Sequence, residues 1–535
     1  MASELIIGVD AGTSVIKAVA FELDGRQIAV ASRPNRVKLG SDGAAEQDLD
    51  GTWEGTAATL RALGERVPDL KQRAVALAAT GQGDGTWLID AAGNPVAPAM
   101  LWLDARAGPQ INRVRASPAA ADIARLTGTA LNPSMQSGQL LWLREQRPEL
   151  LARARTAFHC KDWLYFKATG ERVTSACEGL FTFGNYRNRD YDDETLALLG
   201  LSDLKRLLPP VLDGTRHHAP LTTAAAIDTG LRAGLPVVLP PMDVPATVLG
   251  SGGLAFDQTG VLHRVGCSIL GSTGMHGWVT DELAAIVPSA EAGYTIAMPL
   301  AGVHVRLMSH MAATLNIDWL LSLIADAARC SGAPPTARAE LLERLNALVL
   351  VAAPAQAIYH PYIADSGERG PFVEPSARAQ LSGFSTTLGL PGLARAVFEG
   401  IALATRDCYA ALGPLPDEIR LSGGAARSPA LRQLLATVTG RPVRVSTREE
   451  CGAAGAAIVA SVATGCHRSV REALPQWVEG YLDDRLTLPD PEQVDLYDQV
   501  FAQYRNIATQ ARPAWHALAR MRAGLRNSGM KEQAQ

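Results

Sequence analysis

A short pattern occurs twice in this chain and constrains its fold more than any other feature. Residues 5–9 form an apolar run, Gly12-Thr13-Ser14 a turn, and residues 15–21 a second apolar run. The same order recurs within residues 260–279, around the turn Gly271-Ser272-Thr273-Gly274. Apolar runs of this length separated by turn residues predict buried strands joined in hairpins. The repeat therefore predicts an α/β protein with two halves of related architecture and a boundary near residue 250.

Length and charge narrow the class of protein further. At about 100–200 residues per domain, a chain of 535 residues suggests two or three domains. An apolar fraction of 47% and a charged fraction of 19% are those of an ordinary globular protein. The net charge of -4 gives no electrostatic reason to expect nucleic acid or an anionic membrane as the main partner.

Cysteine spacing and hydropathy predict where the protein works. The seven cysteines contain no CxxC pair and are odd in number, which argues against a disulfide framework or a zinc site. Free thiols fit the reducing cytosol, so we expect a cytoplasmic protein. The first residues show no basic region followed by a long apolar run, and Pro, Gly or charge interrupts the apolar stretches before about 18 residues. We therefore predict neither a secretory signal nor a transmembrane helix.

The first turn has the composition of a phosphate-binding loop. Gly12 allows the backbone to approach a phosphate closely, while Thr13 and Ser14 offer hydroxyls and N–H groups to phosphate oxygens. Asp10, at the end of the preceding strand, is placed where a carboxylate can hold Mg²⁺ through water. The alternative is a plain hairpin turn. The chain has no G-x-x-x-x-G-K-[ST] sequence, which excludes a P-loop as the nucleotide site.

Two further turns are candidates for the same nucleotide site. Thr273 and Gly274 lie in the second turn, and two opposed turns that carry hydroxyls can grip one polyphosphate from both sides. Gly423 and Gly424, with Ser428 shortly after them, follow a strand candidate at residues 419–421. Paired glycines there permit close contact with a flat ligand such as adenine. Ordinary turns remain the alternative for both segments.

One acid in a proline-rich segment is a candidate catalytic base. Asp243 lies in Pro240-Pro241-Met242-Asp243-Val244-Pro245-Ala246, where a buried carboxylate must find partners. It could accept the proton of a substrate hydroxyl that attacks phosphorus. A helix cap or a loop acid is the alternative. The chain has no HExxH or G-x-S-x-G sequence, so zinc catalysis and a serine hydrolase are not expected.

Polar residues after the strand at residues 74–79 suggest a site for a polyhydroxylated substrate. Gln82 and Asp84 lie in Gly81-Gln82-Gly83-Asp84-Gly85, and Trp102 and Asp104 follow within residues 102–106. Each buried hydroxyl left unpaired costs roughly 1–3 kcal/mol, so a polyol needs many donors and acceptors. Trp102 would supply an apolar wall. The alternative is an ordinary turn with a structural pair of Asp104 and Arg106.

Together these segments resemble the FGGY family of carbohydrate kinases. The resemblance runs from about residue 5 to about residue 465. It also includes Leu140-Leu141-Trp142-Leu143, Ser366-Gly367-Glu368-Arg369 and the small residues 452–457. It implies the two-domain actin-like (ribonuclease H-like) ATPase fold, with a mixed sheet flanked by helices in each domain. It further implies domains at residues 1–250 and 251–480, followed by a helical extension at residues 481–535.

The resemblance also implies roles for individual residues. Asp243 matches the family's catalytic base, and the acids expected near Mg²⁺ are Asp10 and Asp243. The residues that match the first phosphate loop are Gly12, Thr13, Ser14 and Lys17. Those that match the second loop and the adenine-side loop are Thr273, Gly274, Gly423, Gly424 and Ser428. The residues that fall where family members contact substrate are Gln82, Asp84, Trp102 and Asp104. The implied cofactors are ATP and Mg²⁺.

Three departures from the family pattern concern the substrate. Gln139 stands where the family usually has lysine, and Val244 stands where glycerol kinases and xylulokinases have an amide side chain. Gly83 replaces the arginine with which glycerol kinases grip their substrate. The segments 81–87 and 242–246 are most similar to those of erythritol kinases. We therefore expect phosphorylation of a terminal hydroxyl of a small polyol, converting erythritol to erythritol phosphate.

Other functions stay open. The first is a kinase for a ketopentose or another sugar. The second is a non-catalytic regulator that binds sugar and ATP, against which the intact Asp10 and Asp243 argue. The third is a filament-forming actin-like protein, against which the polar Gln82, Asp84 and Asp104 argue. The sequence leaves the oligomeric state open, a homodimer included. After residue 490 it predicts a packing helix whose solvated face carries Arg512, Arg520, Arg522 and Arg526.

Overall fold

The first predicted hairpin lies at the centre of a sheet. The structure is a computed structural model that describes residues 3–527. Strand β1 (Leu5–Ala11) pairs antiparallel with β2 (Val15–Glu22) and parallel with β6 (Ala74–Gly81). Every residue of β1 except Asp10 is buried, as expected of a strand with neighbours on both sides and helices over both faces. The sheet has the order β14-β15-β6-β1-β2-β3, with β3 at Gln27–Pro34, β14 at His218–Pro220 and β15 at Pro236–Val238.

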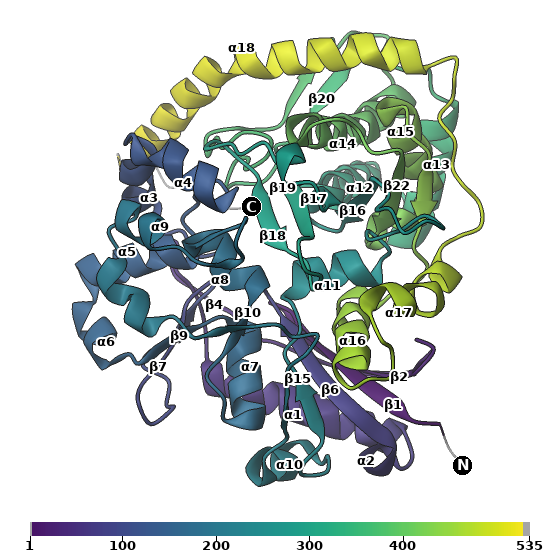
Figure 1. Cartoon of the computed structure of the whole chain (residues 1–535). Coiled ribbons are helices and arrows are strands. Elements are labelled where there is room, and N and C mark those ends of the chain that lie inside the picture. The colour runs from purple at the N-terminus through teal and green to yellow at the C-terminus, as the bar shows by residue number, and fades with distance from the viewer. Residues whose placement is uncertain (1–2, 528–535) are drawn as a thin grey trace.

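A second sheet repeats this arrangement. Strand β16 (Val265–Leu270) pairs antiparallel with β17 (Gly274–Thr280) and parallel with β22 (Glu418–Ser422). The sheet order is β18-β19-β17-β16-β22-β23, with β18 at Tyr294–Ala297, β19 at His304–His310 and β23 at Val443–Val445. Figure 1 shows the two sheets in two lobes, one above the other. The predicted α/β architecture with two related halves is confirmed.

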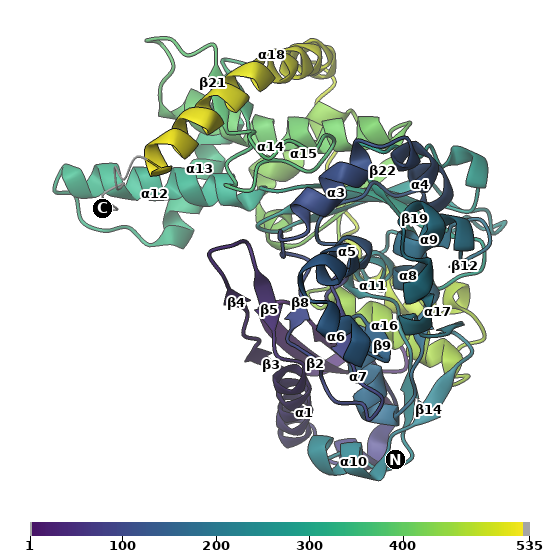
Figure 2. The same cartoon turned by 90° about the vertical axis from the view of Figure 1, so that its left-hand side faces the viewer.

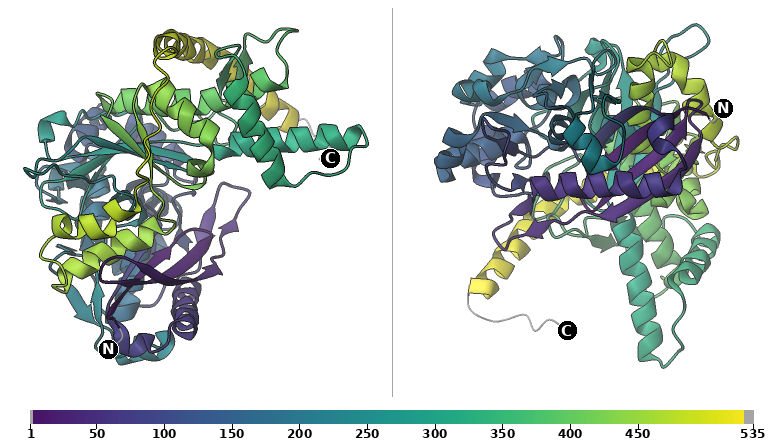
Figure 3. Two further views of the ribbon diagram at one scale, coloured as in Figure 1. Left: turned by 90° about the vertical axis from the view of Figure 1, so that its right-hand side faces the viewer. Right: turned by 90° about the horizontal axis from the view of Figure 1, so that it is seen from below.

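Helices cover the sheets and fill the long insertions of each lobe. The larger helices of the first lobe are α1 (Leu49–Arg66), α5 (Gln136–Gln146), α7 (Cys160–Thr169) and α8 (Ala176–Phe183). The smaller ones are α2 (Leu70–Arg73), α3 (Gly108–Arg115), α4 (Ala119–Thr127), α6 (Pro148–Arg153), α9 (Asp193–Leu198) and α10 (Thr223–Thr229). The second lobe has α12 (Thr314–Cys330), α13 (Arg338–Val351), α14 (Leu390–Leu412) and α15 (Pro429–Thr439). Helices α12 and α13 project together from the body of the protein (Figure 2; Figure 3).

Both lobes also contain short strands outside the two main sheets. In the first lobe they are β4 (Lys38–Leu39), β5 (Ala45–Gln47), β7 (Trp87–Ile89), β8 (Ala99–Met100), β9 (Thr156–Phe158), β10 (Thr174–Ser175), β11 (Gly184–Asn185), β12 (Asp190–Tyr191) and β13 (Val211–Leu212). In the second lobe they are β20 (Ile358–His360) and β21 (Gln380–Ser382). No helix within residues 3–527 is long and apolar enough to cross a membrane.

One helix late in the chain returns to the first lobe. Helix α16 (Cys451–Ala463) follows the second sheet in sequence but packs on β1, β6 and α11 (Asp243–Gly250) (Figure 1). A Cβ atom on Gly455 would lie 1.9 Å from the carbonyl oxygen of Ala246, and one on Gly250 would lie 2.1 Å from that of Cys451. Only glycine permits this separation, so the small-residue segment fixes the position of α11, which begins at Asp243. The sequence did not predict a helix there, because prolines surround the segment.

The predicted C-terminal packing helix is the long α18 (Val494–Asn527). Tyr497, Tyr504 and Trp515 are buried in the core of the second lobe. The guanidinium of Arg512 lies 4.7 Å from the centre of the Phe372 ring, so this exposed arginine also makes a cation–π contact. Arg520 and Arg522 are exposed, as expected of a solvated face, whereas the side chain of Arg526 lies outside the described part of the chain.

Candidate active site

Parallel strands bring the predicted loops of the first lobe together. β1, β6 and β15 run parallel, and Asp10 of β1 is directly opposite Thr80 of β6. The loops at Gly12, Gly83 and Asp243 leave the carboxyl ends of these strands, where open α/β sheets bind ligands. A cavity of about 280 Å³ lies there, facing the second lobe. Its walls include Thr13, Gly83, Asp84, Trp102 and Asp243 from the first lobe and Thr273, Gly274, His310 and Arg369 from the second.

Asp243, the predicted catalytic base, is held in place by two backbone hydrogen bonds. It is the first residue of α11, and its Oδ1 accepts hydrogen bonds from the N–H groups of Gly83 (3.1 Å) and Val244 (2.8 Å). Burial of the carboxyl group, with repulsion from Asp10 and Glu178, raises the pKa of Asp243 to about 8. The form that accepts a proton is the ionised carboxylate, and a divalent cation bound nearby would lower the pKa of Asp243 and favour that form.

Asp10 lies behind the base and fits a role in cation binding. Burial raises its pKa to about 6, opposed by Lys17 and supported by Glu450. A Cβ atom on Gly452 would lie 2.5 Å from Asp10 Oδ2, so the start of α16 closes on this carboxylate. Asp10 in turn raises the pKa of Asp243, which means that two acids repel each other here. A divalent cation would relieve this repulsion, and carboxylate oxygens are ligands that Mg²⁺ prefers.

The side chain of Thr13 is occupied by a network within the first lobe. Its Oγ1 accepts a hydrogen bond from Trp102 Nε1 (2.8 Å) and donates one to Gln82 Oε1 (3.1 Å). Gln82 is 1% exposed and donates to Gln47 Oε1, so it supports the cavity wall without lining the cavity. The network fixes the indole of Trp102 as a wall of the cavity, in agreement with the predicted apolar wall.

Other predicted residues of the first loop lie at the rim or outside the cavity. Gly12 keeps its place in the turn, where its carbonyl accepts a hydrogen bond from Asn35 Nδ2 (2.9 Å). Ser14 is exposed. The ammonium of Lys17 lies 2.9 Å from the Glu450 carboxylate and ties β2 to the segment before α16. None of the three lines the cavity, and their part in nucleotide binding stays a prediction.

Asp84 and Asp104 have opposite environments. Asp84 lines the cavity, has a left-handed backbone (φ +61°) and has a buried Oδ1 without a hydrogen-bond partner among the described residues. Burial raises its pKa to about 7. Asp104 lies outside the cavity, with its carboxylate bound by the Arg106 guanidinium and the Ala45 N–H. This geometry supports the alternative of a structural pair with Arg106, and substrate contact by Asp104 stays a prediction.

The second phosphate loop contains an unusually close contact. Gly274 lies directly opposite His310 on β19, and a Cβ atom on Gly274 would lie 1.6 Å from His310 Nε2. The ring of His310 is fully buried, and neither nitrogen has a partner among the described residues. Burial lowers its pKa to about 4, so the ring is neutral at neutral pH. The Ala313 N–H donates to the Ser272 carbonyl (2.7 Å) and anchors the loop to the start of α12.

The loop at Gly423 follows β22, and the loop at Gly271 follows β16. The two loops lie side by side because these strands are parallel neighbours. Gly423 has φ +87°, and a Cβ atom there would lie 2.6 Å from the Leu270 carbonyl. Gly423 and Gly424 are exposed and leave their surface open. Ser428 Oγ caps α15 by accepting from the Leu431 N–H and also donates to Asn346 Oδ1. None of these three predicted residues lines the cavity, and adenine binding stays a prediction.

The structure adds cavity residues that the sequence did not identify. They are Asn132, Ser134, Tyr294, His310 and Arg369. Asn132 Nδ2 donates to Tyr294 Oη (3.3 Å), which links the first lobe to the second across the cavity. These residues come from segments far apart in sequence, and only the fold brings them together. Arg369 lies in the segment 366–369 that contributes to the family resemblance, but the sequence predicted no role for its side chain.

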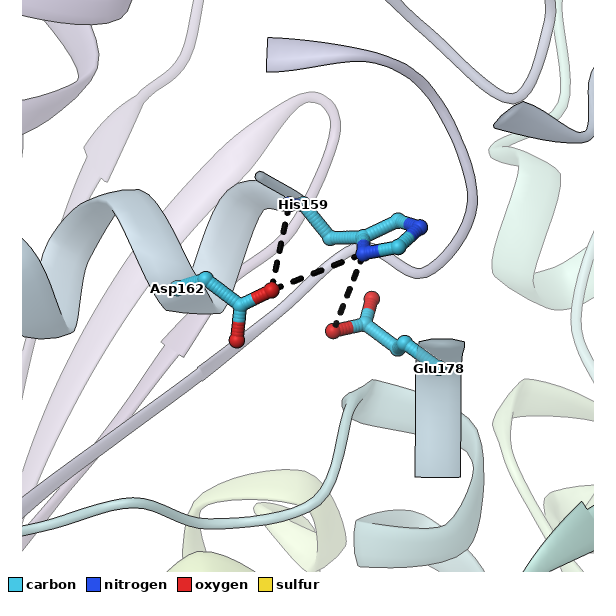
Figure 4. A group of neighbouring side chains, drawn as sticks. All are labelled: His159, Asp162 and Glu178. Atoms are coloured by element: carbon cyan, nitrogen blue, oxygen red, sulfur yellow. Dashed lines mark hydrogen bonds and ion pairs between the residues drawn. The ribbon is translucent and has the colours of Figure 1, made fainter. Parts of the chain in front are cut away.

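A buried cluster of charges lies next to the cavity. His159 Nδ1 lies 3.5 Å from Asp162 Oδ2 and 3.8 Å from Glu178 Oε2, as Figure 4 shows. The ammonium of Lys161 bonds to Asp162 and lies 3.1 Å from Glu178 Oε2. Lys161 thus takes the place of a cation between the acids, and the group does not fit a metal site. His159 and Asp162 form the capping box of α7. Their spacing in the sequence could have indicated the start of this helix, but not the buried cluster.

Burial and pairing set the charge state of this cluster. Burial lowers the pKa of His159, but attraction by Glu178 and Asp162 outweighs burial and leaves the pKa raised. Glu178 raises the pKa values of Asp84 and Asp243, so the cluster acts on both cavity acids. The charge of Glu178 therefore favours the protonated forms of the two carboxyl groups that line the cavity.

Solved structures share this architecture over nearly the whole chain. A gluconate kinase from Lactobacillus acidophilus matches with a TM-score of 0.84 at 20% sequence identity, over 97% of this chain and 100% of that one. A xylulose kinase from Rhodospirillum rubrum matches with a TM-score of 0.83 at 23% identity, over 96% of this chain and 100% of that one. The fold is that of the two-domain sugar kinases, the actin-like ATPase fold, as expected.

Sequence comparison then gives the family. The models of the N-terminal and C-terminal domains of the FGGY family of carbohydrate kinases match residues 5–250 and 266–464. An erythritol kinase of Brucella abortus is 44% identical over 516 residues, 96% of this chain and 98% of the relative. A xylulose kinase of Escherichia coli is 28% identical over 95% of this chain and 99% of the relative. The chain belongs to the FGGY family and is a carbohydrate kinase, an enzyme that uses ATP.

Proposed function

We propose that this kinase transfers the γ-phosphate of ATP to a terminal hydroxyl of a small polyol, and that the polyol is erythritol. The observation that carries the proposal is the setting of Asp243, whose Oδ1 is fixed by two backbone N–H groups in a cavity between the lobes. The similarity to an erythritol kinase over nearly the whole chain supports the choice of polyol.

The residues of the cavity suggest a division of work in the reaction. Oδ1 of Asp243 accepts the two backbone hydrogen bonds, and Oδ2 would take the proton of the attacking hydroxyl. The loops at Gly12 and Thr273 would hold the phosphates from opposite sides. Asp10 and Asp243 would hold Mg²⁺, which supplies neutralisation of phosphate charge when bound. Approach of the two lobes would exclude water and so limit the hydrolysis of ATP.

The size of the cavity near the base favours a short polyol. Gly83 has no side chain, but a Cβ atom there would lie 2.5 Å from Met242 Sδ and 3.4 Å from Asp243 Oδ1. Met242 thus fills the space that a longer residue 83 would need, and Val244 offers the substrate no polar group beside the base. Ketopentoses remain the second candidate substrates, because xylulose kinases match this chain in sequence and in fold.

The test is ATP consumption with erythritol, threitol, xylitol, glycerol, xylulose and ribulose. We expect the highest kcat/KM with erythritol. Higher turnover with a ketopentose would support the kinase activity but show that the preferred substrate is a sugar and not a polyol. No turnover, combined with measurable binding of ATP and polyol, would favour a non-catalytic regulator. We also place the reaction in the cytoplasm, because all seven cysteines are free and two of them, Cys330 and Cys466, are not fully buried.

A further inference from the structure

Arg369 enters the cavity from the second lobe on a fixed loop. The preceding residue, Glu368, is 1% exposed, and its Oε1 accepts hydrogen bonds from the N–H groups of Met311 (2.9 Å) and Arg369 (2.8 Å). Gly370 packs so closely that a Cβ atom there would lie 2.3 Å from the Ser309 carbonyl. The backbone on both sides of Arg369 is therefore tied to the end of β19, and the arginine is presented from a rigid support.

The guanidinium of Arg369 has no carboxylate partner. Its Nη1 donates a hydrogen bond to Ser134 Oγ of the first lobe at 3.4 Å, a long contact. No carboxylate among the described residues lies within 4.0 Å of it. Among the side chains that line the cavity, it is the one with a permanent positive charge. A partly buried guanidinium that lacks an ion pair has several N–H donors free for a ligand.

An acceptor without a partner faces the same space from the first lobe. Asp84 Oδ1 is buried and makes no hydrogen bond within the described residues. Asp84, Tyr294 and Arg369 line the same cavity. Burial raises the pKa values of Asp84 and Tyr294, and the positive charge of Arg369 offsets part of each rise. The left-handed backbone of Asp84 is a strained conformation for a residue with a side chain, of the kind that folds retain at binding sites.

Vicinal hydroxyls match this pair of groups, because each hydroxyl both donates and accepts a hydrogen bond. We propose that Arg369 is a polyol-binding residue of the second lobe: its guanidinium donates to hydroxyls of the substrate whose protons Asp84 accepts. The proposal rests on the proposed polyol kinase function and deepens it. The bound polyol connects the two lobes through Arg369 and Asp84, so substrate binding itself favours closure of the cavity.

The chemistry makes a specific claim about substrate selection. Hydrogen bonds to charged groups contribute more than neutral ones, and a charged group left buried without its partner is costly. A deoxy analogue that lacks a hydroxyl facing Arg369 is therefore a poorer ligand for the native protein than erythritol. The same analogue loses part of its disadvantage when the guanidinium is removed, because only Asp84 Oδ1 then lacks a partner.

The experiment compares Arg369→Gln with the native enzyme by calorimetric titration of erythritol and by steady-state kinetics. We expect the erythritol Kd and KM to rise roughly 10- to 100-fold, with the KM for ATP within about twofold. Arg189→Gln is the matched control, because Arg189 also spans the lobes, donating to the carbonyls of Val303 (3.1 Å) and Met298 (2.9 Å), but does not line this cavity. The control should bind erythritol normally.

A double-mutant cycle of Arg369→Gln with Asp84→Asn adds a measurement that a purely structural role would not affect. The two substitutions should be coupled in erythritol affinity and independent in urea unfolding without ligand. An unchanged erythritol Kd in Arg369→Gln, or a rise confined to the KM for ATP, overturns the inference and in the second case assigns the arginine to the phosphates. A native enzyme that phosphorylates none of the polyols overturns the proposed function instead, and the two failures are distinguished by the native protein alone.

Discussion

The two lobes have the same strand order but present different chemistry to the cavity between them. The first lobe contributes carboxyl groups with raised pKa values, Asp84 and Asp243, with Asp10 behind them. The second lobe contributes hydrogen-bond donors, the cationic Arg369 and the neutral ring of His310. The two lobes thus repeat one architecture, but the acidic side chains lie on the first lobe and the cationic and imidazole side chains lie on the second.

One glycine near the cavity in each lobe also differs in the side chain that a larger residue would meet. Gly83 of the first lobe faces the thioether of Met242, a side chain with three rotatable bonds that can move aside. Gly274 of the second lobe faces the imidazole of His310 on a central strand, a planar ring with little freedom. We therefore expect Gly274 to tolerate substitution less than Gly83. The five predictions below compare the two lobes: four concern substitutions, from the largest effect to the smallest, and the fifth concerns pH.

The largest effect should come from the base of the first lobe. Asp243→Asn keeps an oxygen that can accept from Gly83 and Val244, so the variant should fold normally. It should lose roughly 10²- to 10⁴-fold in kcat because the amide cannot accept the proton. Steady-state assays with erythritol and thermal unfolding of both proteins check this. Near-native turnover in a folded variant would remove Asp243 from the mechanism.

The next effect concerns stability and the buried cluster of the first lobe. Lys161→Met leaves Asp162 and Glu178 without their cation, so the free energy of unfolding should fall by about 3–5 kcal/mol in urea titration. Arg427→Met is the matched control in the second lobe, because its pair with Glu449 is exposed at both ends. A loss of similar size in both variants would show that burial does not distinguish the two pairs.

A smaller loss is expected at the second phosphate loop. Gly274→Ala drives a methyl group into His310, so the free energy of unfolding should fall by about 1–3 kcal/mol and the KM for ATP should rise. His310→Ala removes the obstacle, and the double variant should therefore recover part of both losses. Strictly additive losses would mean that the contact with His310 is not their cause.

The equivalent change in the first lobe should be milder and affect the other substrate. Gly83→Ala places a methyl group against Met242 and beside Asp243 Oδ1, so the KM for erythritol should rise roughly tenfold. The KM for ATP should stay unchanged, in contrast to Gly274→Ala. A rise in the KM for ATP alone would contradict the separation of the two lobes by ligand.

The last prediction is a pH dependence of stability. Asp84 and Asp243, with pKa values near 7 and 8, hold protons in the folded protein that the unfolded chain releases near pH 4. Glu368 behaves in the same way. The folded state binds more protons in this range, so stability should fall as the pH rises towards 8. The lowered pKa of His310 acts oppositely, but only between about pH 4 and 6.5.

Urea unfolding of the ligand-free enzyme at pH 6.5 and 8 isolates the contribution of the acids. The free energy of unfolding should be lower at pH 8, and Asp243→Asn should reduce this difference because one titrating group is removed. A difference unaffected by the substitution would show that Asp243 titrates normally.

The sequence predicted strands and loops better than it predicted contacts between side chains. The strands around Gly12 and Gly271 and the loops after them could be predicted, because apolar runs and turn residues are local signals. The orientations of Gln82 and Asp104 could not be predicted, because contacts with Thr13, Gln47 and Arg106 decide whether each side chain faces the cavity or the interior. The helix at Asp243 escaped prediction because its prolines fit only the first turn of a helix.

The sequence by itself determined that this chain forms two related α/β halves, and its resemblance to a family identified a carbohydrate kinase. It also predicted a catalytic base and phosphate loops. Tertiary structure alone decided which polar groups meet in the cavity. Arg369 and Asp84 are far apart along the chain, as are Gly274 and His310, and their proximity results from strand pairing and lobe packing. Hydropathy and turn preference act over a few residues, whereas a binding site is built from side chains that only the folded backbone brings within hydrogen-bonding distance.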